Sequence, residues 1–316
     1  MTTWPIIVGY RHEVLHTGVL HHLLCDEERA ASVAGALAGA PVVRVLRSSV
    51  ETRVSGFNGR ADLVADVELG DGQTVSVGVE TKVDSNASRE QLVATSGPPH
   101  VGVLLSPGIT AMNLTGRDLA PDMPAWNVIT PDRWASVLRD NGIQHDELLA
   151  PYFAQVEREA DEHARARELA HHPSGSSWSI EGSRRCDGLL EHYAWLAEIR
   201  ERSDAPYEWW TYTNQSGPLM GLWCGKFQGS DRDVFVEFMC SDSSRRLCLK
   251  IGAGQDDLQA TAAAALGGVE GHGWQPGRQP SKRAGTCTAG WLDFSDLAPA
   301  AAAARTRRAI TEIAAG

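Results

Sequence analysis

The hydrophobic pattern of this chain changes its period along the sequence, and each change marks a predicted element. Between residues 11 and 26, apolar side chains recur at helical spacing. Between residues 59 and 83, apolar and polar residues alternate instead, with an interruption at Gly70-Asp71-Gly72. Alternation in two segments joined by a glycine-containing turn predicts a β-hairpin with one buried face and one polar face.

The length of the turn sets the register of this predicted hairpin. If residues 70–72 form the loop, Leu69 pairs with Gln73, and counting back along both strands places Asp62 directly opposite Glu80. Lys82 shares the polar face with Glu80. Facing carboxylates destabilise a sheet unless a positive charge offsets them. A hard divalent cation such as Mg²⁺ (or Mn²⁺) takes oxygen ligands and would supply that positive charge. Alternatively, this is a solvated strand face on which Lys82 pairs with a neighbour.

The other segments of the first half predict an α/β arrangement. A short helix is expected over residues 30–40 and a strand over 42–54. A helix is expected over 85–96, before a continuous apolar strand at 100–106 that is bounded by prolines. A further strand is expected at 127–130, and a helix with proline in its first turn at 131–139.

The second half predicts a different, antiparallel domain. Residues 146–170 are rich in Ala, Glu and Arg and predict one long helix, followed by another over 186–202. Short turns separate four strand-like segments, which predicts a meander with two later helices. The strands are expected at 207–213, 219–227, 234–240 and 246–251, and the helices at 258–266 and 300–314. Tryptophans lie among basic residues here, which suits either a core or the clamping of nucleic acid.

Length and composition predict a soluble two-domain protein. With 316 residues, we expect a first domain at 1–143, a helical connector at 144–175 and an α+β domain at 176–316. The α+β domain at 176–316 would serve substrate recognition or assembly. Since no apolar run approaches 18 residues, we expect a cytoplasmic protein without a membrane span. The six cysteines form no Cys-x-x-Cys pair, so neither a zinc knuckle nor a disulfide framework is indicated.

The formal net charge of −11 argues against binding nucleic acid through bulk electrostatics. A metal-dependent nuclease is still compatible with this charge, because it needs acidic ligands at its centre and only a local basic rim. Four of the 29 basic residues are lysines and the rest are arginines, whose fork suits phosphate.

Four short motifs carry a resemblance to a known family. The segments Gly59-Arg60-Ala61-Asp62 and Glu80-Thr81-Lys82 resemble the signature of the PD-(D/E)XK nuclease superfamily, with Ala61 in place of the proline. The segment Glu13-Val14-Leu15-His16-Thr17 is similar to a motif of the first helix in some members, and Gln91-Leu92 to a motif that follows the lysine. The resemblance covers about residues 10–140 and implies a restriction-endonuclease-like sandwich around a mixed sheet.

The resemblance also implies an activity and a division of roles. It implies a Mg²⁺- or Mn²⁺-dependent nuclease, with DNA as the expected substrate, in defence, restriction or repair. Asp62, Glu80 and the carbonyl of Thr81 would hold the metal, and Lys82 would position the attacking water. Glu13 and Gln91 would assist. Phosphate contacts are expected from arginines near this site, namely Arg53, Arg60 and Arg89. A homodimer is expected because cutting both strands usually needs two sites.

Alternatives stay open for individual residues and for the whole chain. Glu13 could be a surface charge and His16 a hydrogen-bonded core histidine. The chain could also keep the fold and act as a nucleic-acid- or protein-binding subunit with weak or no catalysis. The acidic composition favours a protein partner in that case.

Overall fold

The computed structural model divides the chain into two compact units, Met1–Ala164 and Arg165–Gly316. Each unit has a sheet of its own. The structure describes most of both units in twelve segments. These are residues 12–53, 60–83, 100–108, 126–170, 190–202, 208–214, 217–226, 234–241, 244–252, 258–267, 273–277 and 287–315.

The first unit contains a five-stranded mixed sheet with the strands in chain order. The strands are β1 (Val42–Arg53), β2 (Arg60–Leu69), β3 (Thr74–Thr81), β4 (His100–Leu105) and β5 (Trp126–Ile129). The first three are antiparallel, whereas β4 runs parallel to β3 and β5 parallel to β4. The unit is therefore a mixed α/β structure, as the alternating and continuous apolar segments predicted.

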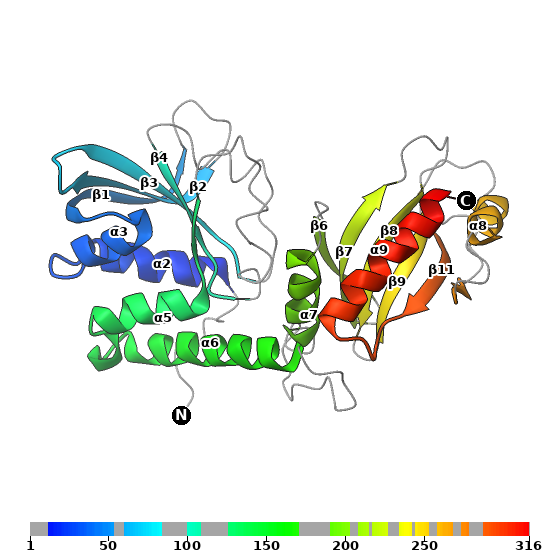
Figure 1. Cartoon of the computed structure of the whole chain (residues 1–316). Helices are drawn as coiled ribbons and strands as arrows, with labels where there is room; N and C mark the ends of the chain where they lie inside the picture. The colour runs from blue at the N-terminus through cyan, green and yellow to red at the C-terminus, as the bar shows by residue number, and fades with distance from the viewer. Residues whose placement is uncertain are drawn as a thin grey trace. The chain divides into compact units, whose positions relative to one another are not determined.

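Helices cover one face of this sheet (Figure 1). They are α2 (Glu13–Leu24), α3 (Ala30–Ala38), α5 (Pro131–Asp140) and α6 (Ala150–Ala170). The predicted inward face of β3 is confirmed, because its alternating valines are buried: Val75, Val77 and Val79, with Val83 just beyond the strand. Each aliphatic side chain removed from water in this way contributes about 1.5–3 kcal/mol, which fixes which face of the hairpin meets the helices.

The predicted hairpin register is confirmed. The amide of Leu69 donates to the carbonyl of Gln73 over 2.8 Å, and the ladder then runs regularly to Leu63 opposite Val79. One further step along both strands leads to Asp62 and Glu80. Gly72 has a φ of 84°, a conformation that glycine adopts without a steric penalty, which allows the three-residue loop to close.

The edge strand β1 carries features that limit pairing with another sheet. Its pairing with β2 is interrupted by two irregularities, and Glu51 has a φ of 48°, which is unusual for a residue other than glycine. Arg44 projects from this strand and forms an ion pair with Glu68 across 2.7 Å, although its side chain remains 66% exposed. Irregular, charged edges of this kind discourage edge-to-edge aggregation.

The start of the long helix belongs to the first unit rather than to a connector over 144–175. Tyr152 and Val156 lie in the core of this unit. Asp146 accepts the amides of Leu148 and Leu149 and pairs with Arg29 over 2.8 Å, and α6 begins at Ala150. The apolar positions of a long amphipathic helix do not reveal which domain buries them, so a domain boundary near this helix cannot be placed from sequence alone.

A buried polar network joins three helices of the first unit. His16 Nδ1 lies 2.8 Å from the hydroxyl of Tyr152, which also accepts a hydrogen bond from Trp134 Nε1 over 2.9 Å. All three side chains are fully buried. Burial raises the pKa of Tyr152, although the Trp134 bond opposes this. His16 is therefore a hydrogen-bonded core residue, which was the alternative given for it above.

Replacing Tyr152 by phenylalanine is expected to destabilise the first unit by about 1–3 kcal/mol, because two buried polar partners lose their hydrogen bonds to the phenol. Hydrogen exchange of the β2 and β3 amides in the full chain measures this for the first unit alone. The control is Glu157→Gln, which alters the exposed pair with Arg139 and is expected to change stability by less than about 1 kcal/mol. Equal protection in both variants would refute the role given to the phenol.

The second unit contains a six-stranded antiparallel sheet in the order β10-β11-β9-β8-β7-β6. The predicted meander is confirmed as β6 (Glu208–Asn214), β7 (Gly217–Lys226), β8 (Val234–Ser241) and β9 (Ser244–Ile251). Two strands were not predicted, β10 (Gln275–Pro276) and β11 (Cys287–Asp293). Glycine and proline in these segments weaken the alternation on which a strand prediction depends.

Three helices accompany this sheet, namely α7 (Leu190–Glu201), α8 (Leu258–Gly267) and α9 (Pro299–Ala315). Trp195 of α7 packs against the sheet and the segment before α9, since its Nε1 donates to the carbonyl of Leu297 over 2.8 Å and its ring meets Phe238 of β8 edge-on. Trp274 is buried, and Trp291 stacks against Arg246 with 4.3 Å between the guanidinium carbon and the ring centroid. These described tryptophans are buried or contact another side chain, which favours their assignment to packing.

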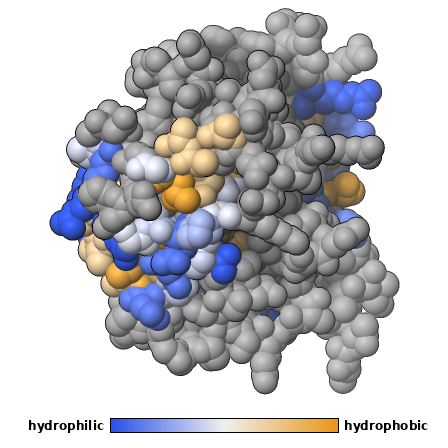
Figure 2. Space-filling view, turned by 90° about the vertical axis from the view of Figure 1, so that its right-hand side faces the viewer, coloured by the Kyte–Doolittle hydropathy of each residue, from blue (hydrophilic) through white to orange (hydrophobic). Residues whose placement is uncertain are grey.

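The described surface of the molecule is mixed in polarity. On the face shown in Figure 2, hydrophobic and hydrophilic residues lie side by side. The cysteines that the structure describes are free thiols, and four of the five are buried. No helix within the described segments is both long enough and apolar enough to cross a membrane.

Candidate active site

A group of charged side chains lies where β2 begins and β3 ends. The regular pairing of these strands stops at Leu63 and Val79. Beyond that point, a carboxylate oxygen of Asp62 accepts the amide hydrogen of Thr81 over 2.7 Å. The side chain of Asp62 therefore bridges the two strand ends, and its orientation is fixed by a backbone group.

Lys82 places its ammonium between carboxylates from two elements. Its Nζ lies 3.0 Å from Glu80 of β3 and 3.3 Å from Glu13 of α2. Glu80 is only 3% exposed and Lys82 only 6% exposed. The backbone of Lys82 is also held, because its amide donates to the carbonyl of Leu105 in β4 over 2.9 Å. Three elements thus position one ion-pair cluster, in which Glu80 and Lys82 are buried and Glu13 is partly exposed.

The first turn of α2 is fastened to the end of β3 through two threonines. Thr17 Oγ1 lies 3.0 Å from Thr81 Oγ1 and donates to the carbonyl of Glu13 over 3.2 Å. Both hydroxyl groups are buried. Glu13 stands in the first turn of the helix, where the helix dipole favours a negative charge.

The electrostatics of the cluster are dominated by burial and by its excess of acids. Burial raises the pKa of Asp62, against the opposing effects of the Thr81 amide and Lys82. Burial and the charge of Asp62 raise the pKa of Glu80, against the hydrogen bond from Lys82. Burial lowers the pKa of Lys82, but Glu80, Glu13 and Asp62 outweigh it and leave the pKa raised. Burial thus outweighs the stabilisation that Lys82 gives to the charged forms of both carboxyl groups.

The donor set fits a hard divalent cation. Asp62 and Glu80 both supply carboxylate oxygens here, and the charge of Asp62 contributes to the raised pKa of Glu80. Added positive charge would lower the raised pKa of both carboxyl groups. Within the described segments, no three side chains of the His, Cys, Asp and Glu types gather closely enough to hold an ion. Mg²⁺ does not need three, because it typically takes one or two carboxylates and keeps several waters.

The structure brings together five of the residues expected at the site: Glu13, Asp62, Glu80, Thr81 and Lys82. Gln91 and Arg89 lie outside the described residues. Arg53 pairs in register with Arg60 at the ends of β1 and β2, and its side chain is outside the described part. Arg60 is 62% exposed and lies 3.9 Å from Glu51, a loose surface pair.

No role for Thr17 was predicted from the sequence, although a signal was present. Thr17 follows Glu13 by four residues, so both lie on the same face of α2. A polar residue on the helix face that meets a sheet needs a partner there. Which strand supplies that partner is decided by how α2 docks, and this could not be read from the helix alone.

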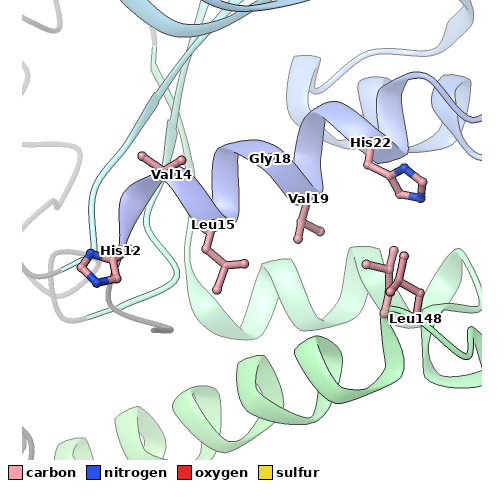
Figure 3. A pocket seen from close by; sticks show the side chains of 8 residues that line it. His12, Val14, Leu15, Gly18, Val19, His22 and Leu148 are labelled. Carbon is pink, nitrogen blue, oxygen red and sulfur yellow. The ribbon is translucent and has the colours of Figure 1, made fainter. Parts of the chain in front are cut away.

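A second feature of α2 is an open apolar groove (Figure 3). Its volume is about 590 Å³, and its walls include Leu15 and Val19 of α2 with Leu148 and Leu149 before α6. His12 and His22 stand at its two ends (Figure 3). None of the charged residues of the acidic cluster lines it. The groove and the cluster therefore lie on different faces of α2.

Comparison of the chain with protein-family models, with curated proteins and with solved structures finds no match. The site's own geometry therefore carries the functional argument.

Proposed function

We propose that this chain is a metal-dependent phosphodiesterase, a DNA endonuclease with a restriction-endonuclease-like first unit. One observation carries the proposal: one step past the Leu63–Val79 pair, Asp62 accepts the Thr81 amide, and the buried Lys82 ammonium lies 3.0 Å from the buried Glu80 carboxylate. Buried groups with a perturbed pKa and specific charge partners are typical of catalytic sites. The motifs that resemble the PD-(D/E)XK superfamily contribute these same residues.

The topology also supports this proposal. A helix bearing Glu13 precedes three antiparallel strands, and a strand parallel to the Glu80 strand follows. This matches the arrangement of helix, hairpin and mixed sheet that the resemblance implies. The hydrogen bond from the backbone amide of Lys82 to the carbonyl of Leu105, in the parallel strand, fixes the point where the site residues leave the sheet.

The proposed roles follow from the chemistry of each group. Asp62, Glu80 and the carbonyl of Thr81 would hold Mg²⁺ (or Mn²⁺), which when bound polarises a phosphoryl oxygen and acidifies water. The ammonium of Lys82 would position the attacking water and stabilise developing negative charge. Glu13 would hold that ammonium in place, and Gln91 would contact the substrate or the water.

Binding of DNA by a chain with a formal net charge of −11 requires local positive charge. We assign this to arginines near the strand ends, namely Arg53, Arg60 and Arg89. The proposal includes a cytoplasmic setting in defence, restriction or repair, and a homodimer that presents two sites to a duplex.

The test of the proposed function is cleavage of plasmid and single-stranded DNA with and without Mg²⁺, for the wild type and for Asp62→Ala and Lys82→Ala. Cleavage that needs Mg²⁺ and is lost in both variants supports a nuclease. Equal cleavage by all three proteins would reveal a contaminant and exclude the assignment. The same assay on RNA shows which nucleic acid is preferred.

A second candidate is a nucleic-acid- or protein-binding subunit that keeps the fold with weak or no catalysis. It is favoured by the Lys82 ammonium, which already lies between Glu80 and Glu13 and neutralises part of their charge. Calorimetric titration with Mn²⁺ separates the two candidates. A non-catalytic scaffold would bind Mn²⁺ no more tightly than Asp62→Ala does.

A further inference from the structure

The closest link between α2 and the site strand is a chain of hydroxyl groups. Thr17 Oγ1 lies within hydrogen-bond distance of the carbonyl of Glu13, at 3.2 Å. The hydroxyl of Thr81 lies 3.0 Å from that of Thr17, a distance at which either hydroxyl can donate to the other. The hydroxyl chain therefore links Thr81, Thr17 and the backbone of Glu13.

This chain closes a ring with the ion pairs of the site. The Glu13 side chain lies 3.3 Å from Lys82 Nζ, and Lys82 directly follows Thr81 in the sequence. The amide of Thr81 is meanwhile held by Asp62. Movement of the first turn of α2 away from β3 would therefore stretch the hydroxyl chain and the Glu13–Lys82 pair together.

We propose that Thr17 is a positioning residue, whose hydroxyl sets the distance between the α2 turn that carries Glu13 and the β3 end that carries Thr81 and Lys82. This inference rests on the proposed function for its effect on catalysis. The proposed spacing between α2 and β3 does not depend on that function. Thr17 acts through its neighbours and is given no contact with substrate.

Substitutions that separate shape from hydrogen bonding test the proposal. Thr17→Val keeps the branched shape and removes the hydroxyl, whereas Thr17→Ser keeps the hydroxyl. In a metal-dependent cleavage assay, Thr17→Val is expected to lower kcat by a factor of about 10–100, as other outer partners of metal sites do. KM for DNA should stay within about threefold, since no substrate contact is lost. Thr17→Ser should recover most of kcat.

A second measurement follows the geometry without using activity. The chain has four lysines, so the ε-methylene NMR signals of lysine-labelled protein are few, and Lys82→Arg assigns the one of interest. The Lys82 signal should shift in Thr17→Val and in Thr81→Val, and should return towards its wild-type position in Thr17→Ser. The Lys226, Lys250 and Lys282 signals should stay in place and show that the fold is kept.

The outcomes separate the two proposals. If the wild type cleaves nothing while the Lys82 signal shifts as stated, the nuclease assignment fails and the positioning geometry stands. If Thr17→Val leaves the Lys82 signal in place, Thr17 is merely structural. The same holds if the wild type cleaves and Thr17→Val retains its kcat. A loss of kcat in Thr17→Ser equal to that in Thr17→Val would also overturn the proposal, because the hydroxyl would then be irrelevant.

Discussion

Asp62→Asn is expected to lower Mg²⁺-dependent cleavage by about 10²–10³-fold, the usual cost of removing one group that stabilises a charged transition state. Asparagine retains an oxygen that can accept the Thr81 amide, which Asp62 holds at 2.7 Å. The loss would therefore reflect the missing negative charge rather than a displaced strand. Initial rates on supercoiled plasmid measure it, and Mn²⁺ calorimetry should show weaker binding in parallel.

The matched control for this substitution is Asp66→Asn. Asp66 lies four residues further along β2, on the same face, and accepts a hydrogen bond from Ser76 that asparagine can also accept. It has the same chemistry without a facing carboxylate, so cleavage should be unchanged. A comparable loss in both variants would mean that charge on this strand matters in general and that Asp62 has no special role.

Asp62→Asn should also stabilise the metal-free protein at neutral pH by about 0.5–2 kcal/mol, as relief of strained functional sites commonly does. The pKa of Asp62 is raised from its ordinary value of 3.8, mainly by burial. A raised folded-state pKa of an acid means that stability is present below the unfolded pKa and is lost as pH rises through the folded pKa. Urea unfolding should therefore show no advantage for Asp62→Asn below about pH 4, and an advantage that grows above it.

Lys82→Met is expected to destabilise the first unit by about 3 kcal/mol at pH 8, because it leaves the buried Glu80 carboxylate without its ammonium. Hydrogen exchange of β3 amides in the full chain measures the change. The double variant Lys82→Met/Glu80→Gln removes both charges and should recover most of this stability. Neither variant should cleave DNA, so stability and activity separate within one pair of proteins.

The exposed pair of Arg44 and Glu68 provides the control for this prediction. Its atoms approach to 2.7 Å, closer than those of Lys82 and Glu80, but Arg44 is 66% exposed. Arg44→Met should therefore change stability by less than about 1 kcal/mol. A similar loss in Arg44→Met and Lys82→Met would show that burial is not what makes the Lys82 pair important.

The contribution of Lys82 to stability depends on pH in the alkaline range, whereas that of Asp62 begins to change at acidic pH. The pKa of Lys82 is raised above its ordinary value of 10.5, because Glu80, Glu13 and Asp62 outweigh its burial. Its stabilising contribution should be complete below pH 10.5 and lost as pH rises through the folded-state pKa. The stability difference between wild type and Lys82→Met should accordingly shrink in strongly alkaline solution.

The hairpin shows how much of the fold and site was local enough to predict. Side chains of a strand alternate with a period of two, so the valines of β3 identified the buried face. The three-residue loop then set the register that leads to Asp62 and Glu80. Strand β11 was missed because its Gly290 interrupts the pattern. A Cβ at that position would lie 2.6 Å from Leu266 of α8, so close packing explains the glycine.

The sequence by itself determined the hairpin, its buried face, the pairing of its strands and the presence of two carboxylates and a lysine at one end. Each of these depends on residues that are close along the chain. The tertiary structure alone decided that Thr17 meets Thr81, that Glu13 meets Lys82, and that His16 is held by Tyr152. These contacts join residues 64 to 136 positions apart, and they depend on how helices dock onto the sheet, which no local pattern specifies.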